Sequence, residues 1–235
     1  MTFPVWIPLG PWRVHPHLLF ESLAYIAGFA IFVARRQTRG DHVPNAVRWS
    51  LVTAAAIGAV IGSHVLNWID ASGFAGKTAV GGLLGAWIAV EIEKKRQHFT
   101  EPTGDLFALP LAIGFAIGRI GCFLTGLPDG TYGVQTTLPW GVDLGDGIRR
   151  HPTALYESAF MIVVAVALVR FERSLPRGAA FKLFVCAYLT FRLVVDIIKP
   201  GDPLALHMTA IQWACVGGLA YYASRVARAR AYHVV

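Results

Sequence analysis

The amino-acid sequence predicts an all-α membrane protein with seven transmembrane helices. Only 15% of its 235 residues are charged and 55% are hydrophobic, whereas soluble domains carry roughly 25% charged residues. The mean hydropathy is +0.52. Apolar stretches close to the length that crosses a bilayer, about 20 residues, alternate with short clusters of basic residues. Together these three observations favour a polytopic membrane protein over a soluble domain.

Seven apolar stretches are the expected transmembrane helices. The first, third and fifth are short or begin with a polar residue, so we expect their ends at the membrane interface or in a cavity. The residues before the first stretch lack the basic start and the cleavage site of a signal peptide, so we expect this stretch to stay in the mature protein. The seven stretches are residues 18–34, 49–69, 78–92, 106–125, 153–169, 179–198 and 204–224.

Basic residues indicate how these helices cross the membrane. If the N-terminus lies outside, 14 of the 21 Lys and Arg residues fall in inner segments and five in outer segments. Cytoplasmic loops carry such an excess of basic residues, which places the C-terminus in the cytoplasm. Membrane orientation thereby explains the net charge of +7, and we expect no nucleic-acid partner.

We expect residues 1–235 to form a single transmembrane domain with one long loop. This loop, residues 126–152, is rich in Gly, Pro, Asp and Thr and is typical of turns and short extended pieces. Loops of this length are often functional. The predicted topology puts it on the outer face of the membrane.

Two similar octapeptides stand at the start of apolar stretches. HPHLLFES spans residues 15–22 and HPTALYES spans residues 151–158. Proline suits the first turn of a helix, and the pattern puts Glu21 and Glu157 at the mouth of each apolar stretch. Two interpretations remain open. The acids balance buried arginines around a lipid cavity, or each octapeptide is a favourable helix start with a buried ion pair.

Six ionisable residues are expected at membrane depth, where a charge costs ~3 kcal/mol on insertion scales. Such residues usually face an interior cavity and mark function. Two of them are arginines, and guanidinium groups bind phosphate oxygens in a bidentate way. We therefore expect an anionic ligand at membrane depth, namely a phospholipid head group. The six residues are Glu21, His64, Arg119, Glu157, Arg192 and Asp196. Lys182 lies near a helix end, where its side chain can reach the interface.

Each arginine also has a structural interpretation. Arg119 lies in a glycine-rich stretch that either packs against another helix or admits a ligand, and it can pair with Glu21 or Glu157. Arg192 and Asp196 are four residues apart, so we expect them on one helix face. They form either a local ion pair or an arginine that the acid orients toward an anion.

We expect no metal and no cofactor. The three cysteines lie in apolar stretches without a CxxC motif. The group His15, His17 and Glu21 is a weak metal candidate, because Pro16 intervenes and no second cluster has ligand spacing. His64 is either a core histidine with satisfied hydrogen bonds or a catalytic base.

Several motifs along the chain point to one bacterial family. They are GGLLGA at 81–86, TGDLFALPLAIGFAIGRIGCF at 103–123, LPWGV at 138–142, RHPTALYE at 150–157 and FRLVVDIIKPGD at 191–202. Together they resemble the prolipoprotein diacylglyceryl transferases, which are inner-membrane enzymes with seven transmembrane helices and an outer N-terminus.

The resemblance implies an activity and a site. The family moves the diacylglyceryl group of phosphatidylglycerol to the lipobox cysteine of a prolipoprotein and releases glycerol phosphate, with the active site toward the periplasm. Arg119 matches its essential arginine near the lipid head group, and Arg192 matches its second functional arginine. The further residues that we expect in the substrate site are Glu21, Gly118, Tyr132, Gly133, Glu157 and Asp196.

Two residues depart from the family pattern. Val80 stands where the family usually has a histidine that assists proton removal from the thiol, and Cys122 stands where asparagine is common. His64, His15 and His151 are the histidines that we expect to supply a base instead. Two alternatives stay open: the same lipid donor with a different acceptor, and a non-catalytic phospholipid-binding protein or flippase.

Overall fold

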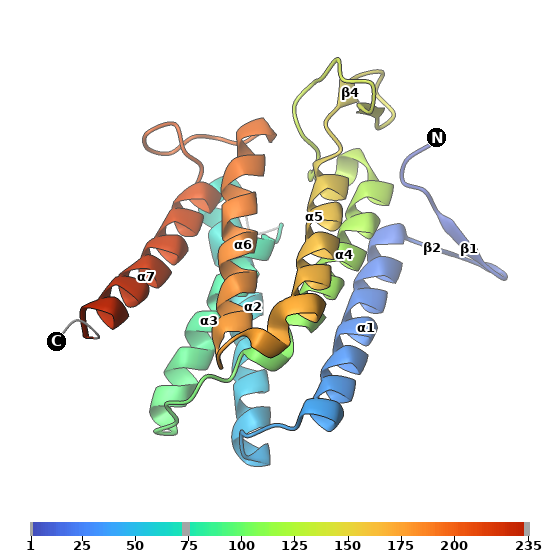
Figure 1. Ribbon diagram of the computed structural model, residues 1–235. Coiled ribbons are helices and arrows are strands. Elements are labelled where there is room, and N and C mark those ends of the chain that lie inside the picture. The colour runs from blue at the N-terminus through green and yellow to red at the C-terminus, as the bar shows by residue number, and fades with distance from the viewer. Residues whose placement is uncertain (1, 72–75, 233–235) are drawn as a thin grey trace. The chain divides into compact units, whose positions relative to one another are not determined.

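The computed structural model describes residues 2–71 and 76–232, and this part of the chain contains seven long helices (Figure 1). Each helix overlaps one of the seven apolar stretches, so the approximate positions of the predicted helices are confirmed. The helices are α1 (Pro16–Arg39), α2 (Asn45–Ala71), α3 (Ala79–Arg96), α4 (Asp105–Thr125), α5 (Thr153–Phe171), α6 (Ala179–Val195) and α7 (Ala210–Tyr232).

The ends of the last two helices differ from the prediction. α6 stops at Val195, and a 3₁₀ turn, η3 (Asp196–Ile198), follows it. α7 begins six residues later than expected, because Thr209 and Gln212 form a reciprocal cap: the Thr209 N–H donates to Gln212 Oε1 at 2.9 Å, and the Gln212 N–H donates to Thr209 Oγ1 at 3.2 Å. This capping box satisfies amides that have no partner inside the helix.

The chain divides into two compact units. The first contains residues 1–40, 104–184 and 195–200, and therefore α1, α4, α5 and the long loop. The second contains residues 41–103, 185–194 and 201–235, with α2, α3 and α7. α6 contributes residues to both units. The prediction that residues 1–235 form a single domain stays a prediction.

In the first unit, α4 packs against α1 on one side and α5 on the other. A Cβ atom on Gly121 would lie only 2.6 Å from the Cβ atom of Phe20 and 3.1 Å from the Pro16 carbonyl oxygen. Glycine at this position therefore allows the start of α1 to approach α4. On the other side, Ser158 Oγ donates to the Ala116 carbonyl oxygen at 2.7 Å and fixes α5 on α4.

In the second unit, glycines bring α2 and α3 into backbone contact. A Cβ atom on Gly62 would lie 2.3 Å from the Gly81 carbonyl oxygen, and one on Gly85 would lie 2.3 Å from the Gly58 carbonyl oxygen. The GGLLGA motif is therefore a helix-packing surface, as small residues provide in membrane helices.

Short elements occupy the N-terminal segment and the long loop. A hairpin that the sequence did not predict joins β1 (Ile7–Leu9) to β2 (Trp12–Val14), and Gly10 adopts the positive φ of 61° that its tight turn needs. The long loop holds the 3₁₀ turn η1 (Leu127–Asp129) and the paired strands β3 (Val142–Asp143) and β4 (Arg149–Arg150). These are the turns and extended pieces that its composition predicts.

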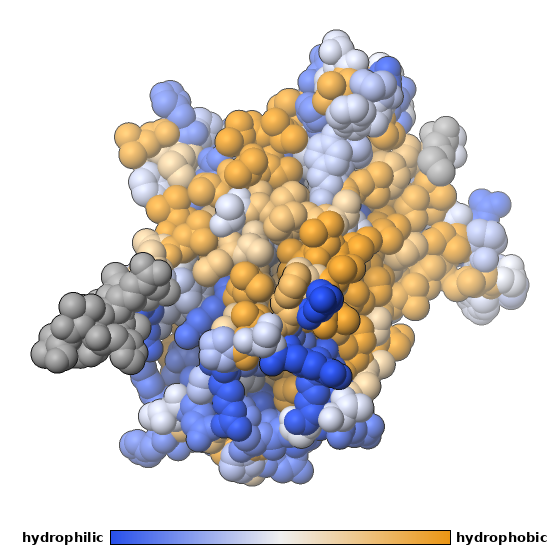
Figure 2. Space-filling view, viewed as in Figure 1, coloured by the Kyte–Doolittle hydropathy of each residue, from blue (hydrophilic) through white to orange (hydrophobic). Residues whose placement is uncertain are grey.

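The helices have the length and surface of membrane-spanning segments. Among the described residues, four helical segments are long and apolar enough to cross a bilayer: Pro16–Arg39, Asn45–Asp70, Asp105–Thr125 and Thr153–Ser174. Large apolar side chains are exposed on them, including Phe29 (58%) and Val163 (64%). Figure 2 shows apolar residues over the outer face of α1 and hydrophilic residues near the end of α5. The chain is thus a helical membrane protein, and the count of seven spans stays a prediction.

Candidate functional site

Arg119 forms a buried ion pair with Glu157 in the first unit. Arg119 lies near the C-terminal end of α4, Glu157 lies in the second turn of α5, and Arg119 Nε is 2.9 Å from Glu157 Oε1. The two side chains are only 13% and 2% exposed. A buried carboxylate beside a buried guanidinium offsets part of the cost of taking both charges out of water. Of the two acids that the sequence offered as partners for Arg119, Glu157 forms an ion pair with it.

The glycines around Arg119 have different environments. A Cβ atom on Gly118 would come no closer than 3.9 Å to Ala24 Cβ, and one on Gly114 would lie 3.6 Å from the Ala24 carbonyl oxygen. These are ordinary van der Waals distances. Of these three glycines, only Gly121, one turn after Gly118 along α4, is required by close packing. The helix contact at Gly114 and Gly118, next to Arg119, therefore tolerates a methyl group.

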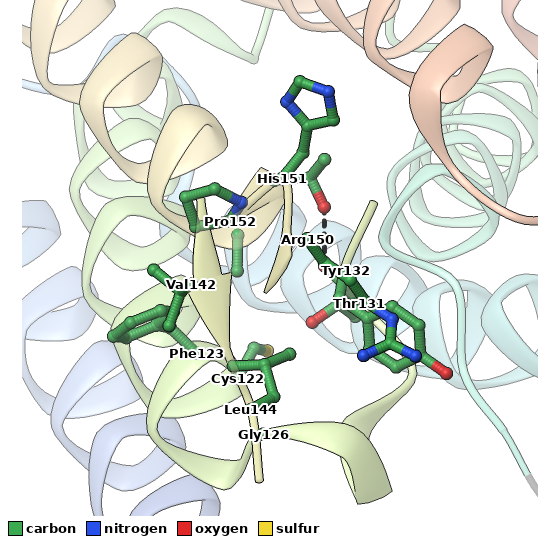
Figure 3. Close-up of a pocket in the computed structure, with 12 residues that line it drawn as sticks. Cys122, Phe123, Gly126, Thr131, Tyr132, Val142, Leu144, Arg150, His151 and Pro152 are labelled. Carbon is green, nitrogen blue, oxygen red and sulfur yellow. Dashed lines mark hydrogen bonds between the residues drawn. The ribbon is translucent and has the colours of Figure 1, made fainter. Parts of the chain in front are cut away.

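Cys122 lies one turn after Arg119 and lines a small pocket. Arg119 Nη1 donates to Cys122 Sγ at 3.7 Å. The pocket lies between the end of α4, the long loop and the start of α5, with an empty volume of about 260 Å³ that includes its opening to solvent. Figure 3 shows Cys122 on one side of the cluster of lining residues and the His151 ring on the opposite side.

Gly133 holds the long loop against the start of α5. A Cβ atom there would lie 2.7 Å from His151 Cβ and 2.8 Å from the Ile198 carbonyl oxygen. The Gly133 N–H donates to the His151 carbonyl oxygen at 2.9 Å, and Thr153 Oγ1 donates to the Thr131 carbonyl oxygen at 2.7 Å. Glycine at this position therefore lets the loop backbone approach the entrance of α5.

Tyr132 and His151 belong to the same loop region and line the pocket. The Arg150 guanidinium lies 5.1 Å above the centre of the Tyr132 ring. His151 Nδ1 lies 3.3 Å from the Tyr156 hydroxyl, which also accepts a hydrogen bond from Trp140 Nε1 at 2.8 Å. His151 is partly buried and lines the pocket.

A second polar cluster lies beside Arg119, on the side of α1. His17 Nδ1 is 2.9 Å from Asp129 Oδ1, and the ligand atoms of His17, Cys122 and Asp129 all lie within 4.8 Å of one another. We call these three residues the His–Cys–Asp cluster. Thr131 Oγ1 donates to the other oxygen of Asp129. Burial acts to raise the pKa of Asp129, but the hydrogen bonds with His17 and Thr131 hold it below its ordinary value.

The sequence did not reveal this cluster. The sequence groups His17 with His15 and Glu21, whereas the structure joins it to Asp129, 112 positions away. Glu21 lies at the edge of the cluster: its Oε2 is 3.7 Å from His17 Nε2, and its Oε1 accepts a hydrogen bond from the Tyr25 hydroxyl at 3.3 Å. The PDG turn after α4 was the one sequence feature that could have indicated the cluster, because an aspartate at a turn can face the preceding helix.

Three other residues of interest lie at the end of α6 or in the second unit. Arg192 is in the last turn of α6 and is 4% exposed, while Asp196 begins η3 and is 7% exposed. α6 ends at Val195 and η3 continues directly from it, so Arg192 and Asp196 stand on either side of the junction between an α-helix and a 3₁₀ turn. The prediction that they share one helix face stays a prediction. His64 lies on α2, and its Nδ1 hydrogen-bonds the Val60 carbonyl oxygen of the preceding turn at 2.9 Å.

Val80 shows what replaces the expected histidine. It lies in the first turn of α3 and is only 1% exposed. Thr78 caps this helix by accepting a hydrogen bond from the Gly81 N–H at 3.1 Å. An apolar side chain buried at this position cannot remove a proton.

The fold and the site define a class: a helical membrane protein with a buried arginine–glutamate pair beneath a glycine-positioned loop. Comparison with known proteins gives the family. The chain belongs to the prolipoprotein diacylglyceryl transferase family, whose model matches residues 4–226.

Curated relatives are similar along almost their whole length. A protein of Bordetella bronchiseptica is 30% identical over 91% of this chain and 90% of its own length. Proteins of Geobacter sulfurreducens and Coxiella burnetii (strain RSA 331 / Henzerling II) are each 30% identical, over 85% and 91% of this chain and 83% and 88% of their own lengths. All three are named phosphatidylglycerol–prolipoprotein diacylglyceryl transferase.

Proposed function

We propose that this chain transfers the diacylglyceryl group of phosphatidylglycerol to the cysteine thiol of a prolipoprotein and releases glycerol phosphate. The observation that carries the proposal is the buried Arg119–Glu157 pair in a chain of this family. The reaction takes place in the bacterial cytoplasmic membrane, with the site toward the periplasm. This location agrees with the distribution of basic residues between the apolar stretches.

Arg119 has the chemistry that the leaving group requires. Displacing glycerol phosphate concentrates negative charge on the phosphate, and a fixed guanidinium stabilises charge that develops in the transition state. Glu157 binds Nε of Arg119 and so fixes the plane of the guanidinium. The phosphate binds the Nη edge, where Arg119 now contacts Cys122 Sγ, in the bidentate manner typical of arginine.

Other residues of the proposed site act around this pair. Gly133 and Tyr132 set the position of the loop over the lipid head group, and Gly118 leaves room beside Arg119. Glu21 and Asp196 carry negative charge that balances the arginines. Arg192 is proposed as a second arginine for the phosphate, on the strength of its family motif and its burial.

The acceptor thiol must lose its proton before it attacks, because a free thiol has a pKa of about 8.5. His64, His15 and His151 are the histidines that the sequence offers for this step. His151 has the best support, because it lines the pocket beside Tyr132. Replacing each histidine by glutamine and measuring the transfer rate tests these roles: a fall of at least about 10²-fold in a folded His151→Gln protein supports the assignment, and a wild-type rate rejects it.

One assay tests the reaction itself. Purified protein in detergent micelles is incubated with phosphatidylglycerol labelled in its head group and with a peptide that carries a lipobox cysteine. We expect equal amounts of labelled glycerol phosphate and lipidated peptide, and no product from a peptide with serine in place of the cysteine. Failure to form either product, with lipid still bound, rejects the transferase and favours a phospholipid-binding protein or flippase.

Val80 is a specific reason to consider a second acceptor for the same lipid. The family's usual base is replaced by this valine. The residues expected to act on the acceptor therefore depart from the family pattern more than the residues expected to bind the lipid donor. Release of labelled glycerol phosphate in the presence of membrane extract, without lipidation of the peptide, identifies this case.

A further inference from the structure

We propose that the His–Cys–Asp cluster binds a Zn²⁺ ion, and that this ion holds the acceptor thiol as a thiolate. The three residues offer one imidazole nitrogen, one sulfur and one carboxylate oxygen, all within 4.8 Å of one another. Nitrogen, sulfur and oxygen donors of these kinds are the ligands that Zn²⁺ takes in proteins. The thiol-binding half of the proposal rests on the proposed function, whereas the metal-binding half does not.

The distances suit a metal after small side-chain movements. Tetrahedral Zn²⁺ with bonds of about 2.0–2.3 Å separates its ligand atoms by about 3.3–3.6 Å. His17 Nδ1 and Asp129 Oδ1 are 2.9 Å apart and must open slightly, while the largest present separation of 4.8 Å must shorten. The backbone elements that carry the ligands, the start of α1, the end of α4 and η1, need not change partners.

Each ligand already has an outer partner of the kind that supports metal ligands. Metal-bound histidines commonly donate their second ring N–H to a carboxylate, and His17 Nε2 lies 3.7 Å from Glu21 Oε2. Thr131 holds the second oxygen of Asp129, which leaves Oδ1 toward the cluster. Arg119 Nη1 donates a hydrogen bond to Cys122 Sγ at 3.7 Å.

The cluster is open on one side. Cys122 and Asp129 are buried, with Cys122 8% exposed and the Asp129 side chain 6% exposed, but the His17 side chain is 41% exposed. Three protein ligands with one open position are typical of catalytic rather than structural zinc sites. The carboxylate and the Cys122 thiolate together neutralise the charge of Zn²⁺, so a further thiolate bound at the open position keeps its electron density and remains nucleophilic.

This arrangement is an alternative to a histidine base such as His151 for removing the proton of the acceptor thiol. A thiol that coordinates Zn²⁺ loses its proton to solvent. Its sulfur then attacks the glycerol carbon that carries the phosphate ester, the carbon–oxygen bond to the phosphate breaks, and the electron pair leaves with glycerol phosphate. The cluster adjoins Arg119 through Cys122, so the attacking sulfur and the proposed phosphate site are neighbours.

Cobalt spectroscopy tests the metal site without using activity. Full-length protein is stripped with a chelator and titrated with Co²⁺. We expect one Co²⁺ per chain, a thiolate-to-cobalt charge-transfer band, and displacement by Zn²⁺. Cys122→Ala should abolish the band. His17→Gln and Asp129→Asn should each weaken Co²⁺ binding at least about tenfold, because even mutation of a residue that only hydrogen-bonds a metal ligand typically costs about tenfold or more in metal affinity. Cys186→Ala, which changes a cysteine in the other unit, should retain the band.

Two results would overturn the metal site: absence of a thiolate band in the unmodified protein, and persistence of the band in Cys122→Ala. Thermal unfolding of each variant shows whether it is folded, and His17→Gln keeps the test valid if Cys122→Ala fails to fold.

The thiol-binding half has its own readout. Adding the lipobox peptide to the Co²⁺ protein should increase the charge-transfer band, and the serine peptide should not. If Co²⁺ binds through Cys122 but the cysteine peptide leaves the spectrum unchanged, the ion is structural and the thiol-binding half is wrong. If the spectrum responds but no lipid is transferred, the proposed function fails while the metal site stands.

Discussion

Glu21 and Glu157 occupy the same place in two similar octapeptides, yet the Glu21 side chain is 35% exposed and the Glu157 side chain is 2% exposed. Both octapeptides start a helix, as their His-Pro pattern predicts. Glu157 then meets Arg119 of α4 at 2.9 Å, whereas Glu21 meets the residues of its own helix, His17 and Tyr25. A local sequence can therefore specify a helix start twice, while the neighbouring helix decides what the acid does.

The largest expected effect is the removal of the buried acid. Glu157→Ala leaves Arg119 buried without its carboxylate, which typically costs ~3–5 kcal/mol. The matching change in the other octapeptide, Glu21→Ala, removes a part-exposed contact and should cost at most about 1 kcal/mol. Thermal unfolding of both variants in the same detergent measures the difference, and equal shifts would contradict the distinction between the two acids.

A double substitution separates the stabilising role of the pair from its chemical role. Arg119→Leu with Glu157→Leu removes both charges together and should recover most of the stability lost in Glu157→Ala, because apolar residues of similar volume often replace a buried pair without cost. Transfer from phosphatidylglycerol should nevertheless stay undetectable. Recovery of transfer together with stability would show that the pair is only structural.

The next effect concerns how the first octapeptide docks on α4. Gly121→Ala pushes a methyl group to within 2.6 Å of Phe20 Cβ, and overpacking of this kind costs about 1–3 kcal/mol. Gly118→Ala is the matched control, because its methyl group would stay 3.9 Å from its nearest neighbour. A fall in unfolding temperature for Gly121→Ala alone is the expected result, and the reverse order would reject the packing assignment.

The smallest effect concerns the aromatic residue of each octapeptide. Tyr156 accepts a hydrogen bond from Trp140 and contacts His151, whereas its counterpart Phe20 has no hydroxyl. Tyr156→Phe should loosen the long loop by about 0.5–1.5 kcal/mol. Faster amide exchange in residues 126–152, with unchanged exchange in α1, is the expected measurement, and unchanged exchange in the loop would contradict it.

The sequence predicted the helices well because apolar length and turn residues are local properties. It placed α1 and α5 within two residues of their observed starts. It misplaced the start of α7, although Thr209 and Gln212 form a capping box that is legible in the sequence. The end of α6 at Val195 was missed because the apolar pattern continues through the 3₁₀ turn.

The site was harder to predict because its contacts join distant parts of the chain. Arg119 was recognised as a buried charge, but spacing could not choose between Glu21 and Glu157, which have equivalent positions in similar octapeptides. The contact of His17 with Asp129 spans 112 residues. Only the packing of α1 on α4 brings His17 to the turn that follows Cys122, and no periodicity in the sequence records that packing.

The most direct test of the account is the transfer rate of Arg119→Lys, compared with Arg96→Lys. Arg96 also pairs with a glutamate, Glu93, but its side chain is 70% exposed. A lysine keeps the charge and loses the planar pair of donors, so Arg119→Lys should lower transfer from phosphatidylglycerol by at least about 10²-fold while the protein stays folded, and Arg96→Lys should leave the rate unchanged. Wild-type transfer by a folded Arg119→Lys protein would contradict the central claim that this buried guanidinium stabilises the departing phosphate.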